Sequence, residues 1–109
     1  MEKVDKLVIS QHASPVEVDM KKVKNVAMAM RAINHGLRQT IIRLLDEQKR
    51  LTVTEIYKKL NLEQSVASQH LAILRRAGFV KTEREGKFIF YCTNRSRFAE
   101  VAKVANDFV

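Results

Sequence analysis

The chain has 109 residues, which argues for one domain rather than two, and 46% of them are hydrophobic, which excludes wholesale disorder. Its formal charge of +8 favours a polyanionic partner over a merely soluble basic surface. The single cysteine, Cys92, excludes a disulfide framework within the chain, and the apolar runs fall far short of the roughly 20 residues of a membrane span. Together these features predict a cytoplasmic protein that does not enter a membrane.

The N-terminal residues 1–13 show no helical period, so we expect a flexible tail ahead of a single domain at residues 14–109. The first helix is predicted to start at Ser14, which can cap it, with Pro15 at the first helical position and Glu17 completing a capping box. The apolar residues that follow at helical spacing are Met20, Val23, Ala27 and Met30.

Three further helices are predicted before a hairpin. The second spans about Leu37 to Glu47, and Leu51-Thr52-Val53 then forms a short extended piece. Thr54 is predicted to cap a third helix that runs to Leu60. The fourth runs from about Gln64 to Ala77 and ends at Gly78, because glycine adopts the left-handed conformation without strain.

The last part of the chain predicts two strands and a final helix. The strands are Phe79 to Arg84 and Lys87 to Cys92, joined by a tight turn at Glu85-Gly86. The final helix spans about Ser96 to Val109. This order predicts a mainly α fold with a small β-hairpin, the winged helix-turn-helix.

The first and last helices carry apolar stripes that are wide for the surface of a small monomer. Either both stripes pack onto their own domain, or they join two copies in a symmetric dimer, which we favour. The residues expected at that dimer interface are Val23, Ala27, Met30, Phe98, Val101, Ala105 and Phe108.

The fourth helix has one apolar side and one polar side without acidic residues. Its polar side begins with Gln64, Ser65, Ser68 and Gln69 and continues with Arg75 and Arg76. Gln can bond adenine bidentately in the major groove, Ser permits close approach, and Arg binds phosphate or guanine. A merely solvated face would more usually carry Glu and Lys pairs. We therefore expect this side to contact DNA.

His70 and the hairpin carry weaker signals. His70 falls on the apolar side, where a half-buried imidazole bonded to a backbone carbonyl is favoured over a phosphate contact. Lys81, Arg84 and Lys87 surround the hairpin tip and can reach a phosphate row, although Glu83 and Glu85 dilute the charge. The residues predicted to bind DNA are Gln64, Ser65, Ser68, Gln69, His70, Arg75, Arg84 and Lys87.

These residues resemble the ArsR (ArsR/SmtB) family of bacterial dimeric repressors. The resemblance covers about Ala32 to Tyr91, and its most specific part is the segment QSVASQHLAILRRAGFV followed by REGK and an aromatic strand. It implies a winged helix-turn-helix dimer joined by its first and last helices. It also implies that Gln64, Ser65, Ser68 and Gln69 face the operator.

The sequence departs from this family at its metal sites. Thr52 and Thr54 stand where many members have a cysteine pair, and hydroxyls are poor ligands for soft metals. The final helix lacks histidine and offers Glu100 and Asp107 alone of the usual second ligand set. His12, His35 and His70 show no ligand spacing. We therefore predict no metal site and no cofactor.

We predict a homodimeric, sequence-specific DNA-binding regulator, with repression at an inverted-repeat operator as the favoured activity and the effector unidentified. Half-sites are expected about 34 Å apart. One alternative is a winged helix that binds protein, and another is a redox-responsive regulator that uses Cys92, although a lone cysteine is more often a small core residue. An enzyme is disfavoured, because the sequence shows no nucleophile–base pair, phosphate loop or metal cluster.

Overall fold

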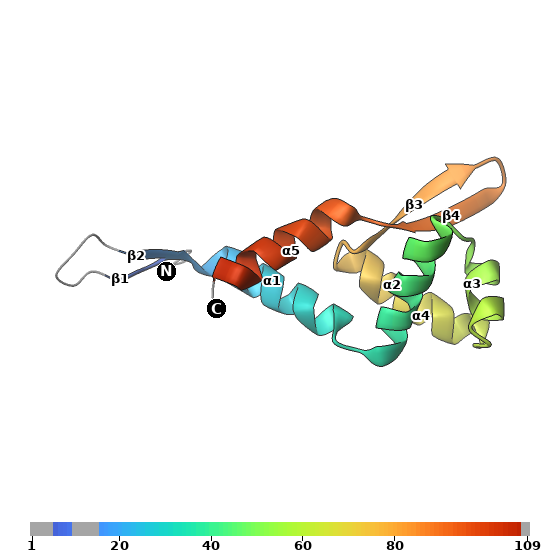
Figure 1. Cartoon of the computed structure of the whole chain (residues 1–109), viewed down its shortest axis with the longest axis horizontal. Helices are drawn as coiled ribbons and strands as arrows, with labels where there is room; N and C mark the ends of the chain where they lie inside the picture. The colour runs from blue at the N-terminus through green and yellow to red at the C-terminus, as the bar shows by residue number, and fades with distance from the viewer. Residues whose placement is uncertain (1–5, 10–15, 108–109) are drawn as a thin grey trace, which may run out of the picture.

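The computed structural model describes residues 6–9 and 16–107. Its elements are a short N-terminal hairpin, four helices, a second hairpin and a final helix (Figure 1). In chain order they are β1 Lys6–Ile9, β2 Val16–Asp19, α1 Met20–Ile33, α2 Gly36–Gln48, α3 Val53–Lys59, α4 Gln64–Arg76, β3 Val80–Glu85, β4 Phe88–Thr93 and α5 Arg95–Asp107. The predicted order of five helices with a hairpin between the last two is confirmed.

The core forms where the apolar stripes of the helices meet under the β3–β4 hairpin. α2, α3 and α4 converge there, and Leu51, which precedes α3, forms an isolated bridge with Tyr91 of β4. Burying each large apolar side chain contributes roughly 1.5–3 kcal/mol, so this cluster stabilises the arrangement of α3 and α4. The largest fully buried side chains are Phe79, Ile41, Leu45, Ile56, Leu71 and Leu74.

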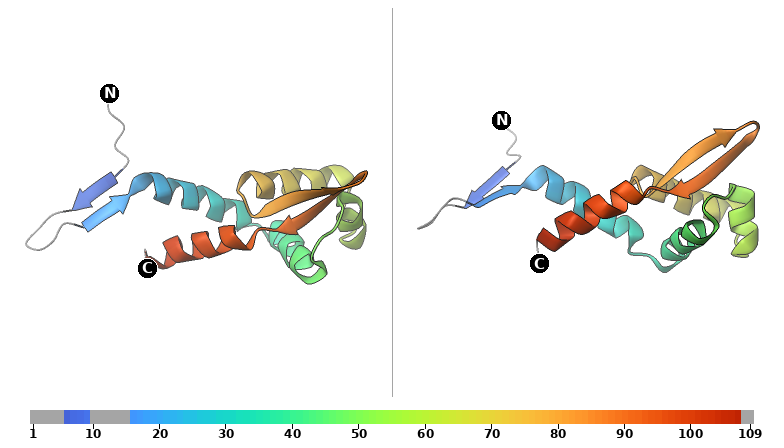
Figure 2. Two further views of the ribbon diagram at one scale, coloured as in Figure 1. Left: turned by 90° about the horizontal axis from the view of Figure 1, so that it is seen from above. Right: turned by 45° about the horizontal axis from the view of Figure 1, so that its top comes forward.

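α1 and α5 lie side by side and run in opposite directions, and the pair extends away from the body that holds α2 to α4 (Figure 2). Val26 and Ala29 of α1 and Val101 and Val104 of α5 are buried in the core cluster. Part of each apolar stripe therefore packs within the chain. Another part stays accessible, and Met30 keeps 45% of its surface exposed.

The predicted start of the first helix is wrong. Val16 to Asp19 form strand β2, and α1 begins at Met20 with Asp19 as its N-cap, whose Oδ1 accepts a hydrogen bond from the Lys22 N–H at 3.1 Å. The capping-box pattern is a local signal, and here the pairing of β2 with β1 outweighs it. The predicted cap Ser14 and Pro15 lie outside the described residues.

Strand β1 falls inside the segment predicted to be a tail. Lys6–Ile9 pairs with β2 in antiparallel register, which the sequence did not reveal because neither strand is longer than four residues. The predicted flexibility of residues 1–13 remains a prediction.

Two other boundaries also differ from the prediction. Thr52, not Thr54, caps α3, because Thr52 accepts a bond from the Glu55 N–H while the Glu55 carboxylate accepts one from the Thr52 N–H. The hairpin turn is Gly86–Lys87 rather than Glu85–Gly86, since Glu85 pairs with Phe88. Gly86 has φ +62°, as the first central residue of a two-residue hairpin loop often requires.

The α3 cap gives a direct test of the corrected helix start. Thr52→Ala should lower the free energy of unfolding by about 1 kcal/mol, because the side-chain acceptor for the Glu55 N–H is lost. Urea denaturation at one fixed protein concentration measures the change. Thr54→Ala is the matched control, since Thr54 is exposed inside the first turn, and it should change the free energy by less than about 0.5 kcal/mol. A larger loss in the control would restore the predicted cap.

Candidate nucleic-acid interface

One side of α4 is buried and the other is open to solvent, as the sequence predicts. Ala67, Leu71 and Leu74 are buried in the core. The opposite side carries no acidic residue along the helix. Its exposed residues are Gln64, Ser65, Ser68, Gln69, Ala72, Arg75 and Arg76. Their exposure is confirmed, and their contact with DNA remains a prediction.

Turns with left-handed residues fix both ends of α4. Before the helix, Asn61 has φ +54° and the Leu62 N–H donates to the Tyr57 carbonyl oxygen at 2.9 Å. After it, Gly78 has φ +88°, and the Phe79 N–H donates to the Leu74 carbonyl oxygen at 3.0 Å. The chain can therefore present the polar side of α4 in one orientation.

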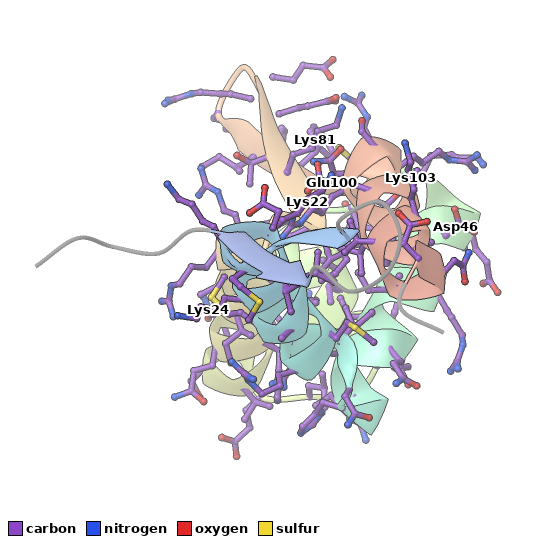
Figure 3. The ribbon with its side chains drawn as sticks, turned by 90° about the vertical axis from the view of Figure 1, so that its left-hand side faces the viewer. Lys22, Lys24, Asp46, Lys81, Glu100 and Lys103 are labelled. Carbon is purple, nitrogen blue, oxygen red and sulfur yellow. The ribbon has the colours of Figure 1, made fainter. Side chains whose placement is uncertain are left out.

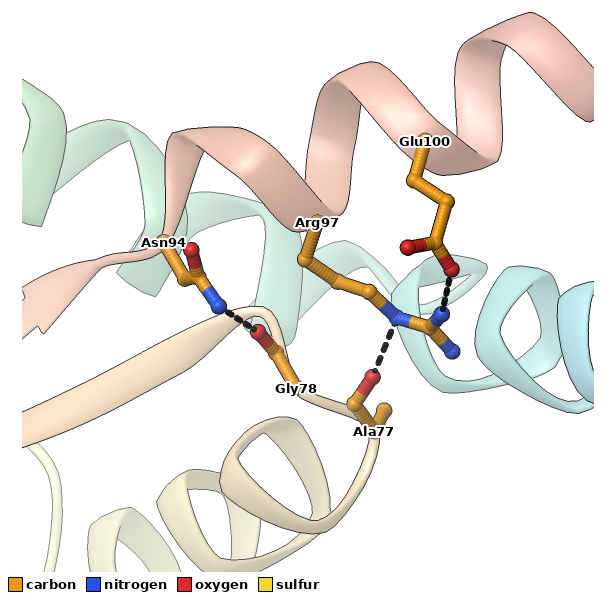
Figure 4. A network of polar contacts seen from close by, with 5 residues as sticks. All are labelled: Ala77, Gly78, Asn94, Arg97 and Glu100. Atoms are coloured by element: carbon orange, nitrogen blue, oxygen red, sulfur yellow. Dashed lines mark hydrogen bonds and ion pairs between the residues drawn. The ribbon is translucent and has the colours of Figure 1, made fainter.

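A polar network ties α5 to the C-terminal end of α4 (Figure 4). Arg97 Nε donates to the Ala77 carbonyl oxygen at 2.9 Å, and Arg97 Nη1 lies 2.6 Å from Glu100 Oε1. Asn94 Nδ2 donates to the Gly78 carbonyl oxygen at 3.0 Å. The Arg97 side chain is only 13% exposed, so its bond to Ala77 is partly shielded from water, whereas the Glu100 side chain is 53% exposed. Sequence reasoning missed this network, because its partners are backbone carbonyls some 16–20 residues away.

A concave surface of about 400 Å³ lies between α4 and β4. Ser68, Arg75 and Arg76 line it from α4, and Tyr91 lines it from β4. Hydroxyl and guanidinium groups are the usual donors to DNA phosphates. Sequence reasoning missed Tyr91, because it treated this residue as part of a strand face and not as a neighbour of α4.

The β3–β4 hairpin exposes Lys81, Arg84 and Lys87, as expected for a wing that reaches phosphate. Arg84 Nε donates to the Gly86 carbonyl oxygen at 3.3 Å, which holds this side chain near the tip. Glu85, which seemed to weaken the basic character of the hairpin, forms an ion pair with Arg50 at 2.6 Å. Its negative charge is therefore partly balanced from within the chain.

His70 contacts a cation rather than the predicted backbone carbonyl. Its Nδ1 lies 3.3 Å from Arg38 Nη1, and its ring centre lies 4.8 Å from that of His35. Because a guanidinium can only donate, His70 Nδ1 is the acceptor and the imidazole is neutral. Arg38 Nε also donates to the Ala32 carbonyl oxygen, so His70 connects α4 to the α1–α2 corner.

Partial burial lowers the pKa of His70, and the charges of His35 and Arg38 lower it further. An unfolded chain therefore takes up a proton at this residue at higher pH than the folded chain does. The stabilising contribution is fully present above pH 6.5, the ordinary histidine value, and is lost as the pH falls below it.

The residues predicted at a dimer interface divide into three groups. Met30 is exposed, and Val23, Ala27, Phe98 and Ala105 are partly exposed. Val101 is already buried within the chain, so little of it is left for a partner to contact. Phe108 lies outside the described residues.

The described residues provide no group of three or more His, Cys, Asp or Glu side chains that could hold a metal ion. Thr52, which stands at a position of the family's metal ligands, is used as the α3 cap.

Cys92 is buried, and burial together with nearby Glu83 raises the pKa of its thiol. The reactive thiolate is therefore disfavoured, which fits a core residue better than a redox switch. Within the described part of the chain, no helix is long and apolar enough to cross a membrane.

The architecture and the exposed polar side of α4 define a winged helix-turn-helix protein. Residues 36–82 match the model of the bacterial regulatory protein, arsR family. The transcriptional repressor PagR of Bacillus anthracis is 30% identical over 90 residues, which cover 83% of this chain and 90% of PagR. The transcriptional activator HlyU of Vibrio cholerae is 39% identical over 75 residues, 69% of this chain and 68% of HlyU.

Solved structures agree with these relatives. The crystal structure of PagR superimposes with a TM-score of 0.65 at 30% identity, covering 73% of this chain and 93% of that one. The solution structure of a homodimeric winged helix-turn-helix DNA-binding domain from Mycobacterium bovis gives a TM-score of 0.69 at 26% identity, covering 85% and 86%. The chain belongs to the ArsR family, and its predicted class of winged helix-turn-helix transcriptional regulator is confirmed.

The Arg97 network gives the first prediction about this interface. Arg97→Leu should lower the free energy of unfolding by about 1–3 kcal/mol, because the carbonyl of buried Ala77 loses its side-chain donor. Urea denaturation measures the loss. Arg95→Leu is the control, since its ion pair with Asp46 is 3.5 Å long and largely exposed, and it should change the value by less than about 0.5 kcal/mol. Equal losses of unfolding free energy in the two variants would show that the Arg97 bonds stabilise the fold no more than an exposed ion pair does.

The second prediction concerns acid sensitivity. His70→Gln should be less stable than the unsubstituted chain at pH 8, and this difference should shrink as the pH falls from 7 to about 5. The reason is that the lowered pKa costs the unsubstituted chain stability in this range, whereas glutamine does not titrate. Denaturation curves of both proteins at several pH values measure the difference. A difference that stays constant or grows with acid would contradict the lowered pKa.

Proposed function

We propose that this chain is a homodimeric, sequence-specific DNA-binding regulator whose two α4 helices enter successive major grooves of an inverted-repeat operator. The observation that carries the proposal is the acid-free, exposed polar side of α4 beside the concave surface lined by Arg75, Arg76 and Tyr91. This side carries amides and small hydroxyls at its N-terminal half and cations at its C-terminal half. Base-reading groups and phosphate-binding groups are thus placed along one helix.

Each DNA-facing residue has a role that its chemistry supports. Gln64 and Gln69 offer paired donor and acceptor atoms to an adenine edge. Ser65 and Ser68 keep the helix surface low, so the backbone can approach the bases. Arg75 and Arg76 bind phosphates, and Arg84 and Lys87 of the hairpin do so on a neighbouring phosphate row or in the minor groove. The part of His70 in DNA binding is indirect, through its bond to Arg38.

The homodimer is supported by the part of each apolar stripe that the chain leaves accessible, including Met30 and Phe98. The similar domain from Mycobacterium bovis is described as homodimeric. Two copies related by a twofold axis match an inverted repeat with half-sites about 34 Å apart. The protein acts in the cytoplasm, without catalysis and without a cofactor.

Repression is the activity we favour. PagR is named a repressor and HlyU an activator, so membership of the family leaves both possible. Repression requires only that the dimer occupy a promoter, which the α4 surface suffices to do. Activation would require a further surface that contacts the transcription machinery.

Two alternatives are weaker. A winged helix that binds protein should expose aromatic or aliphatic anchors on α4, but this side carries Gln, Ser and Arg. A regulator that senses oxidants through Cys92 would need an accessible thiolate, and the thiol is buried with a raised pKa.

The proposal is tested by selecting operators from a pool of randomised duplexes and then titrating the selected duplex and a scrambled one at two salt concentrations. Fluorescence anisotropy should show a preference of about a hundredfold or more for the selected duplex, and the preference should persist at the higher salt. Equal and salt-sensitive binding to both duplexes would reject sequence-specific recognition. No binding to either would favour a protein-binding winged helix.

Base reading by α4 is tested by single substitutions. Gln64→Ala or Gln69→Ala should weaken operator binding by roughly 1–3 kcal/mol and leave binding to scrambled DNA nearly unchanged. Arg84→Ala is the contrasting variant, because loss of a phosphate contact should weaken binding to both duplexes and reduce the salt slope by about 1. Anisotropy titrations over a range of salt concentrations separate the two patterns. Equal losses on both duplexes for the Gln variants would mean that they touch only phosphate.

A further inference from the structure

Three arginines from three different helices line one recess beside α4. Arg31 comes from the last turn of α1, Arg38 from the start of α2 and Arg76 from the end of α4, and they surround a volume of about 290 Å³. We call this surface the arginine recess. Its other lining residues are all apolar, and they are Met28, Ala32, Ile73 and Ala77.

The positive charge of the arginine recess has no acidic partner within the described part of the chain. Among those residues, the side chains of Arg31 and Arg76 form neither an ion pair nor a hydrogen bond. Arg38 donates to the Ala32 carbonyl oxygen and contacts His70, and neither group carries a negative charge. Like charges gathered around one recess repel each other, so a bound anion would stabilise this arrangement.

Arg76 connects the arginine recess to the exposed polar side of α4. At about 100° per residue, Arg76 shares a direction with Gln69, seven residues earlier on that side. On one flank of this side, Arg75 and Arg76 line the concave surface that Tyr91 of β4 closes. On the other flank, Arg76 and Ile73 line the arginine recess. Cations therefore continue from the wing side of α4, across its exposed side, to the corner between α1 and α2.

A recognition helix needs cations on both of its flanks to bind DNA firmly. The major groove is about 12 Å wide and a helix with its side chains is about 10–12 Å across, so phosphates lie close to the helix on either side. The wing and Arg75 are placed to contact phosphates on one flank of α4. The arginine recess is on the opposite flank, and a guanidinium can donate two parallel hydrogen bonds to one phosphate.

We infer that the arginine recess binds the DNA backbone, with Arg31, Arg38 and Arg76 contacting phosphates on the flank of α4 opposite the wing. The inference rests on the proposed function and adds to it a DNA-binding surface at the corner between α1 and α2. With phosphates bound on both flanks, α4 is held across the groove as well as along it.

Salt-dependent anisotropy titrations of full-length variants test the arginine recess. Arg31→Ala should weaken binding to the selected operator and to the scrambled duplex by the same factor, about three- to tenfold, and reduce the salt slope by about 1. The reason is that Arg31 contacts phosphate and not base edges. Because Arg31 is exposed, the urea midpoint of the variant should match that of the unsubstituted chain.

Lys103→Ala is the charge-matched control. Lys24 and Arg31 are seven residues apart, about two helical turns, so they lie on the same side of α1. In the view along the long axis of the molecule, Lys103 of α5 projects on the side opposite to Lys24 (Figure 3). Lys103→Ala removes the same charge as Arg31→Ala but far from the recess. It should therefore leave the salt slope unchanged, with both variants compared as dimers.

Neutralising single phosphates of the operator locates the contact. Duplexes that carry one uncharged methylphosphonate at a time are titrated with the unsubstituted chain and with Arg31→Ala. At the phosphate that Arg31 binds, the two changes should not add, because both remove the same interaction. The same series with Arg84→Ala identifies the phosphate bound by the wing. The two positions should differ and should flank the bases that α4 reads from opposite sides.

Several outcomes would overturn the inference and separate it from the proposed function. An unchanged salt slope for Arg31→Ala, with the operator preference retained, would reject the recess as a DNA contact and leave the proposed function intact. If calorimetry then showed inorganic phosphate binding that Arg31→Ala removes, the recess would be a site for a small anion instead.

The controls give further outcomes of this kind. An equal loss of slope in Lys103→Ala would mean that net charge acts without a local contact. Coinciding methylphosphonate positions for Arg31→Ala and Arg84→Ala would contradict the placement on opposite flanks. No binding of the unsubstituted chain to either duplex would reject both the recess and the proposed function.

Discussion

The burial of Phe79 at the corner between α4 and β3 is the contact on which the rest of the molecule depends. Phe79 is fully buried, its ring centre lies 4.6 Å from that of Phe98, and the Arg97 guanidinium lies 5.9 Å away. The corner can form because Gly78 adopts φ +88°, and a Cβ there would also press on the Arg97 side chain at 3.3 Å. The buried ring of Phe79 thus contacts α5 at the point where α4 ends and the wing begins.

Local patterns predicted α4 and its two sides correctly, because helical period and a terminal glycine act within a few residues. They failed where partners are distant in sequence. The capping pattern at Ser14–Glu17 predicted a helix start, but β2 pairs with β1 there instead. Thr54 was the predicted cap of α3, but Thr52 is the cap, because it forms a complete capping box with Glu55. The role of Arg97 in holding the end of α4 could not be predicted, because no sequence pattern reveals that a guanidinium will bind a backbone carbonyl 20 residues away. The candidate site was therefore predictable as a face, while the contacts that hold this face in position were not.

α4 is fastened at two separate points, and this determines how rigidly it presents its polar side. Near its middle, His70 meets Arg38, which itself bonds the end of α1. At its C-terminal end, Arg97 of α5 and Asn94, which directly precedes α5, hold the backbone of Ala77 and Gly78. A helix held at two points by residues of α2 and of the start of α5 cannot tilt without breaking partly buried polar bonds, and each broken bond costs stability.

α5, which holds the end of α4, also supplies, together with α1, the apolar surface expected to join two copies. The stripes of α1 and α5 are wider than one contact requires. The inward side of these helices carries Val26, Ala29, Val101 and Val104. An apolar groove that stays open to solvent is lined by Met30 of α1 and Phe98 of α5. The two interpretations of these stripes, internal packing and dimerisation, are therefore compatible, because each uses a different side of the same helix. Since α5 contacts both the end of α4 and this accessible side, any partner or ligand that shifts α5 must also act on the bonds that orient α4.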